Sequence, residues 1–118
     1  MPGGGYVHEA ALTLAGDGDD RAPGAAVTVA LCGHWEHDGP CRWPHHTALC
    51  RVGDELAVRT VFASQPGEEE LVRGRISEAL AAGELDGLGG RTSWTLVRDS
   101  PGTLTATEQE RAERLADL

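Results

Sequence analysis

The densest group of chemically reactive side chains lies between Cys32 and Cys50 of the 118-residue chain. Four of the five histidines, all three cysteines and two of the three tryptophans fall within this stretch. Imidazole nitrogen and thiolate sulfur are preferred zinc ligands, and a structural zinc ion usually takes four of them in a tetrahedron. These residue types, gathered in a short stretch, predict a transition-metal site.

The candidate metal ligands are the histidines and the central cysteine of this stretch: His34, His37, Cys41, His45 and His46. The first three, with one of the last two, would supply three imidazole nitrogens and one sulfur. Zinc is the expected cofactor, with copper or nickel as alternatives because they accept the same ligands. The spacing matches no standard zinc signature, since neither paired C-x2-C units nor an H-E-x-x-H motif is present.

Segment 34–46 is predicted to be a loop, because Gly39, Pro40 and Pro44 exclude a continuous helix. The spacing is symmetric about Cys41, with Cys32 and Cys50 nine residues away on either side and His37 and His45 four residues away. If the flanking segments pair as a hairpin, each of these pairs becomes a cross-strand pair, with Cβ atoms about 5 Å apart. Such a hairpin would bring the imidazoles and the thiol toward one ion.

The two outer cysteines, Cys32 and Cys50, are expected to be buried free thiols, because free cysteine is among the most buried residue types. A Cys32–Cys50 disulfide is the alternative in an oxidising compartment. His8 lies apart from the other histidines and is expected to be exposed on a strand.

The leading functional hypothesis is a non-catalytic metal-binding module, in which the ion orders loop 34–46 and thereby stabilises the fold or presents a surface to a partner. The first alternative is a metal-free interaction or accessory-subunit domain, with Trp35 and Trp43 as anchors for a protein partner or a second copy.

Two catalytic alternatives use the same stretch. One is a small metalloenzyme with an open coordination position and Glu36 or Asp38 as general base. The other is a thiol nucleophile at Cys41 with His37 or His45 as its base.

Charge and hydropathy narrow the remaining classes. Nineteen acidic residues against ten basic ones give a net charge of −9, which opposes binding to nucleic-acid phosphates. The chain contains no run of eighteen apolar residues and no leader-like N-terminus, so we expect no membrane span and a cytoplasmic protein. The acidic run 17–20 lacks the twelfth-position Glu of a calcium loop, since position 28 is Thr.

The pattern of apolar residues predicts one α+β domain over residues 1–118. Strands are expected at 6–14, 25–34, 46–52, 55–63 and 92–98, and helices at 68–82 and 108–117. Neighbouring strands joined by turns favour antiparallel pairing. The expected sheet is therefore mainly antiparallel, with about five strands: a four-strand meander, then the main helix packed on one face, then a last strand.

The C-terminal helix is expected to begin with a capping box formed by Thr107 and Glu110. Because segment 108–117 has few apolar residues, it is expected to pack loosely.

Overall fold

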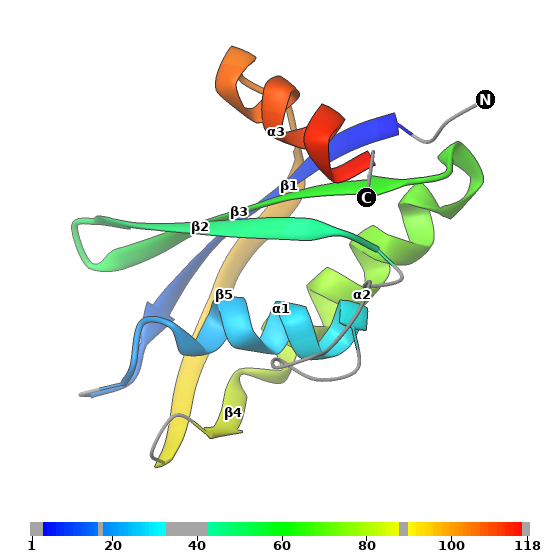
Figure 1. Ribbon diagram of the computed structural model, residues 1–118. Coiled ribbons are helices and arrows are strands. Elements are labelled where there is room, and N and C mark those ends of the chain that lie inside the picture. Colours follow the sequence, from blue (N-terminus) through cyan, green and yellow to red (C-terminus); the bar gives the residue numbers. More distant parts are fainter. Residues whose placement is uncertain (1–3, 17, 33–42, 88–89, 117–118) are drawn as a thin grey trace.

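The computed structural model describes residues 4–16, 18–32, 43–87 and 90–116 (Figure 1). Its elements, in chain order, are β1 (Gly4–Leu14), α1 (Ala22–Cys32), β2 (His45–Val52), β3 (Glu55–Ser64), the 3-10 turn η1 (Pro66–Glu68), α2 (Glu69–Ala82), β4 (Glu84–Gly87), β5 (Gly90–Gly102) and α3 (Ala106–Ala116). The fold is α+β, as predicted. No helix in the described parts of the chain is long and apolar enough to cross a membrane.

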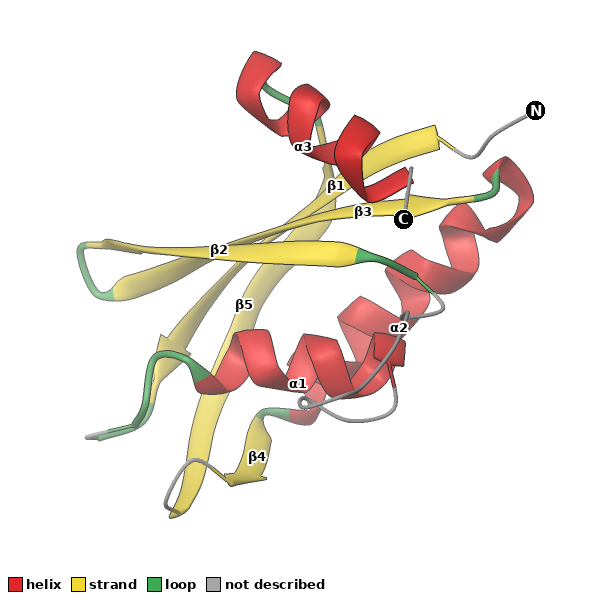
Figure 2. Cartoon of the chain, in the orientation of Figure 1, coloured by secondary structure: helices red, strands yellow, loops and turns green. Residues whose placement is uncertain are grey.

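The five strands form one antiparallel sheet in the order β2-β3-β1-β5-β4 (Figure 2). The predicted four-strand meander is wrong, because β1 pairs with β3 and β5 rather than with the next strand along the chain. Helix α1 connects β1 to β2, which are not neighbours in the sheet, and β3 lies between these two strands. Strands β1 and β2 therefore flank β3, and strands β3 and β5 flank β1, which gives two interleaved split β-α-β units.

Segment 25–34 was predicted to be a strand, but residues 22–32 form helix α1. The segment is apolar on nearly every side, so its hydrophobic pattern fits both a strand and a helix. Burial in the folded chain follows the helical period, with Ala22, Ala26, Val27 and Leu31 facing the core. A hairpin about Cys41 is therefore wrong, because the segment before it is helix α1 and not a strand.

The prediction for the second half of the chain is closer. Hairpin β2–β3 turns at Gly53, and helix α2 ends at Gly83, whose φ of 73° suits a residue without a Cβ. Strand β4 lies between the expected helix 68–82 and the expected strand 92–98, where no element was predicted, and β5 continues to Gly102, beyond the expected end at residue 98. The expected number of about five strands is thus correct for the described residues, although one expected strand is a helix and one strand was missed.

Two helices cover one face of the sheet and α3 lies on the other (Figure 1). The main core lies beneath α1 and α2 and includes Phe62, Leu12, Ile76 and Trp94. On the opposite face, Ala112 of α3 packs in a smaller cluster with buried residues of β1 and β3.

Helix α3 begins two residues earlier than predicted, and its capping box is formed by Thr105 and Glu108. Each of these residues bonds the other's backbone N–H through its side chain. The helix is also docked more firmly than expected, since Ala112 is 1% exposed and Arg59 of β3 binds Glu108 through two hydrogen bonds of 2.7 and 2.8 Å.

Candidate functional site

The two ends of the histidine-rich segment are held in the main core. Leu31, near the end of α1, is 3% exposed, and Trp43, just before β2, is 2% exposed. Both belong to the same cluster of buried side chains. Several residues to which the sequence analysis gave a role lie between these ends, outside the described residues: His34, Trp35, Glu36, His37, Asp38 and Cys41.

His45 is half-buried on the face of β2 that packs against α1. Its Nδ1 lies 3.1 Å from the carbonyl oxygen of Trp43, so this nitrogen carries the proton and donates it. Its Nε2 lies 3.1 Å from the hydroxyl of Thr28 on α1. The ring is therefore oriented by a backbone carbonyl, and its second nitrogen is directed toward α1.

His46 points to the opposite face of the sheet, as neighbouring residues of a strand must. The side chain is exposed there, but partial desolvation against the sheet, together with the nearby positive charge of Arg111, lowers its pKa below 6.5. His45 and His46 cannot both bind one ion in this arrangement. The structure thus places on opposite faces two candidate ligands that the sequence left as equivalent.

The structure bears on two further residues of this stretch. Cys50 is an exposed free thiol and not a core residue. It lies on the face of β2 that points away from α1, which is called the outer face of the sheet below. Its strand position was predicted correctly, but the sequence did not reveal which face of β2 is covered. Trp43 is buried and lies beneath Arg75, whose guanidinium carbon is 5.1 Å from the ring centroid. It is therefore part of the core cluster rather than an exposed side chain.

A buried polar cluster around His8 was not predicted from the sequence. His8 was expected to be exposed, but it is 4% exposed between β1 and α2. Arg73 lies 3.2 Å from His8 Nδ1 and also donates to the carbonyl of Val7 at 2.8 Å. Because arginine can only donate, Nδ1 accepts, and Nε2–H donates to Asp99 Oδ2 at 2.8 Å.

Asp99 accepts a second hydrogen bond from Ser77, and Glu69 pairs with Arg73 at 2.7 Å. Burial alone would raise the pKa of Asp99, but the hydrogen bonds from Ser77 and His8 outweigh it and hold the pKa below its ordinary value. The polarity pattern of β1 could have indicated this cluster, because His8 shares its strand face with Tyr6 and Leu12 of the core.

Ser77, His8 and Asp99 do not have the geometry of a nucleophilic triad. In a triad the carboxylate and the hydroxyl bind different imidazole nitrogens, so that one nitrogen can take the hydroxyl proton. Here both groups face Nε2, at 2.8 Å for Asp99 and 3.4 Å for Ser77, and the hydroxyl donates to the carboxylate. The cluster joins α2 to the sheet, and His8 is not placed to take the proton of the Ser77 hydroxyl.

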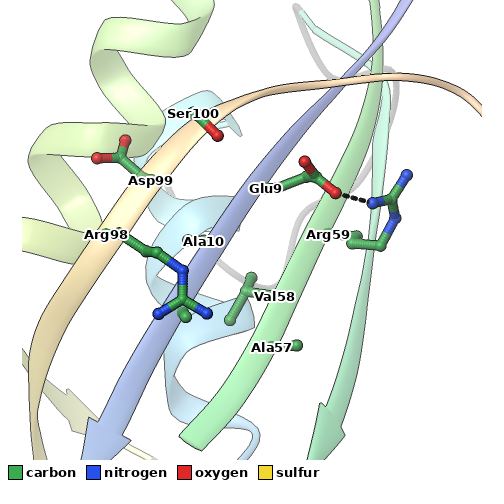
Figure 3. A pocket seen from close by; sticks show the side chains of 9 residues that line it. Glu9, Ala10, Ala57, Val58, Arg59, Arg98, Asp99 and Ser100 are labelled. Atoms are coloured by element: carbon green, nitrogen blue, oxygen red, sulfur yellow. Dashed lines mark hydrogen bonds and ion pairs between the residues drawn. The ribbon is translucent and has the colours of Figure 1, made fainter.

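A hollow of about 290 Å³ opens on the outer face, beside the Glu9–Arg59 ion pair (Figure 3). Arg98 reaches toward it from β5, while Asp99 turns the other way, toward α2. Arg59 also binds Glu108 and the carbonyl of Thr103, so its donors are already engaged. The charge of Arg59, one of the two arginines that line the hollow, is therefore neutralised by Glu9 and Glu108 of the same chain.

Within the described ranges, no three His, Cys, Asp or Glu side chains gather closely enough to hold a metal ion. No protein-family model, curated protein or solved structure matches this chain.

Proposed function

We propose that this chain is a transition-metal binding module that holds a zinc-like ion beside the C-terminal end of α1. The proposed ligands are His34, His37, Cys41 and His45, which together offer three nitrogens and one sulfur. The first three are assigned from residue type and spacing. His45 is chosen over His46 because it lies on the face of the sheet that carries α1.

The observation that carries the proposal is the orientation of His45. A metal-binding histidine usually donates its second ring N–H to a carboxylate, a backbone carbonyl or water, which fixes the tautomer and the ring plane. His45 makes such a bond from Nδ1 to the Trp43 carbonyl at 3.1 Å. Nε2 is then the metal-binding nitrogen, and its contact with Thr28 would be exchanged for the ion.

The surroundings suit this role. Trp43 is 2% exposed, so the residue that supplies the orienting carbonyl is itself fixed in the core. Leu31 fixes the other end of the segment in the same core. Because both ends of segment 34–41 are fixed in the core, the segment can adopt fewer conformations before it binds an ion. The conformational entropy lost when its ligands come together on one ion is therefore smaller.

Native mass spectrometry of the untagged chain, loaded with zinc, tests the proposal. We expect about one bound ion per chain for the wild type and for His46→Gln, and loss of the ion in His45→Gln. The two variants change neighbouring residues in the same way, so His46→Gln controls for the substitution itself. Chelation should lower the melting temperature of the wild type, and added zinc should restore it.

Two results would contradict the proposal. One is a wild-type chain that carries only trace metal and melts at the same temperature with and without chelator. The other is equal retention of zinc by His45→Gln and His46→Gln, which would mean that the orientation of His45 has no part in binding.

A further inference from the structure

Strand β2 forms one edge of the sheet, and among the described segments only β3 pairs with it. The backbone N–H of Ala63 donates to the carbonyl of Pro44 at 3.0 Å, which fixes the phase of this ladder. Positions that exchange hydrogen bonds alternate along an antiparallel pair. The N–H and C=O groups of Thr47, Leu49 and Arg51 therefore point away from β3, toward the outside of the sheet.

This edge has few of the features that keep sheet edges from pairing. Protected edges are short, or carry lysine, proline or a bulge. Strand His45–Val52 is eight residues long, its register with β3 is continuous, and its one arginine is Arg51. The edge strand at the other side of the sheet, Glu84–Gly87, has four residues.

Helix α1, which has no charged residue, lies beside this edge of the sheet. Its sequence, APGAAVTVALC, contains no charged residue, although a quarter of the chain is charged. It is held against β2 by the contact of Thr28 with His45 at 3.1 Å. Ala25 and Val29 are only partly buried. A helix without a polar face is ordinarily covered on all sides, so part of this helix lacks its expected cover within the described chain.

We propose that two copies of this chain associate through their β2 strands, antiparallel, so that two five-stranded sheets join into one continuous sheet. A strand edge paired with its own copy about a two-fold axis matches donors with acceptors automatically. A second copy also suits the charge distribution. The chain carries a net charge of −9, but β2 and α1 together hold no carboxylate, so pairing of the β2 edges brings no carboxylates of these two elements together.

The proposed register is centred on Leu49, the middle one of the outward-facing positions Thr47, Leu49 and Arg51. Centring the two-fold axis on Leu49 pairs Leu49 with Leu49 of the second copy, and Thr47 with Arg51. All three positions then exchange hydrogen bonds, and no two like charges lie opposite each other. On the outer face, Ala48 lies opposite Cys50 of the second copy, at a pair that is not hydrogen-bonded and therefore close.

Sedimentation of the full chain over a range of concentrations tests the association, with a proline variant to block the edge. Arg51→Pro removes an outward N–H and leaves the β2–β3 ladder intact. We expect it to weaken dimerisation by about tenfold or more, since the two-fold axis doubles the loss. Arg51→Ala keeps the N–H and should dimerise like the wild type. A wild-type chain that stays monomeric, or equal dimerisation by both variants, would overturn the proposal.

Oxidative cross-linking tests the register. Ala48→Cys should form a disulfide with Cys50 of the second copy, because opposite residues at such a pair have Cβ atoms close enough to bridge. Val52→Cys, on the same face and strand, lies opposite His46 and should give little cross-linked dimer. Peptide mapping of the disulfides identifies the pair. Equal cross-linking of the two variants, or none by Ala48→Cys, would overturn the register and with it the proposed pairing.

Discussion

The polar side chains around His8 are joined to one another by hydrogen bonds. Arg73 is central, because its guanidinium binds Glu69, His8 and the Val7 carbonyl at once, and the residue is 7% exposed. Buried polar groups are tolerated when all are satisfied, and removing one member leaves the others without partners. The cluster therefore acts as a fixed joint between α2 and β1.

Arg73→Ala is expected to destabilise the fold by about 2–4 kcal/mol, because it leaves a buried carbonyl, an imidazole nitrogen and a carboxylate without a donor. Urea denaturation, followed by tryptophan fluorescence, measures the change in free energy of unfolding. Arg75→Ala is the matched control on the same helix, and it should cost less than about 1 kcal/mol because Arg75 is exposed. Equal effects of the two variants would show that the cluster adds no stability.

At the scale of elements, α2 has one glycine within it and another directly after its last residue, and the two positions have opposite requirements. Gly83 ends the helix with a φ of 73°, and a Cβ there would lie 2.7 Å from the Trp94 carbonyl oxygen. Gly74 lies within the helix, and a Cβ there would meet nothing within 4 Å. The same substitution should therefore change stability in opposite directions at the two sites.

Gly74→Ala is expected to raise the free energy of unfolding by about 0.5–1 kcal/mol, because alanine favours helix and narrows the unfolded ensemble. Gly83→Ala is expected to lower it by more than about 1 kcal/mol, through backbone strain and the contact with Trp94. Thermal unfolding of both variants checks the pair. Stabilisation by Gly83→Ala would mean that α2 does not end in the left-handed turn.

Helix α3 should detach from the sheet in acid. Hydrogen bonds from Arg59 are the main cause that lowers the pKa of Glu108 from 4.5 to about 2. A depressed carboxyl pKa gives stability that is complete above the unfolded value of 4.5 and is lost as the pH falls toward 2. The expected loss is about 1–3 kcal/mol, since the pair is partly buried.

Thermal unfolding of the wild type and of Glu108→Gln across this pH range measures the effect. Glu108→Gln should be less stable at neutral pH and should lose less stability on acidification. Glu110→Gln, an exposed position on the same helix, serves as the control. If the wild type and Glu108→Gln lose equal stability in acid, the ion pair with Arg59 does not hold α3.

At the scale of the whole molecule, the sequence predicted the class of fold and most elements with a clear period. The two strands of hairpin β2–β3 and helix α2 were predicted correctly, each with bounds that differ from the structure by at most one residue. Helix α1 was not predicted, because segment 22–32 is apolar throughout and its hydrophobic pattern fits a strand as well as a helix. That this segment is helical depends on its packing against α2 and β2. Because this segment was assigned to a strand, the predicted order of the strands was wrong as well.

The candidate site was predicted only in part, for a related reason. Residue type and spacing identified potential ligands, but whether His45 or His46 faces α1 depends on which face of β2 is covered. That is settled by α1, the element that the sequence misassigned. The burial of His8 and Trp43 likewise depends on neighbours far along the chain, which local pattern does not encode.

The central claim is that His45, two further histidines and Cys41 bind one ion. X-ray absorption at the zinc edge, on the untagged zinc-loaded chain, tests this most directly because it reports the atoms bonded to the metal. The account predicts a four-coordinate ion with three nitrogens near 2.0 Å and one sulfur near 2.3 Å. A shell of oxygen and nitrogen atoms without sulfur would contradict it.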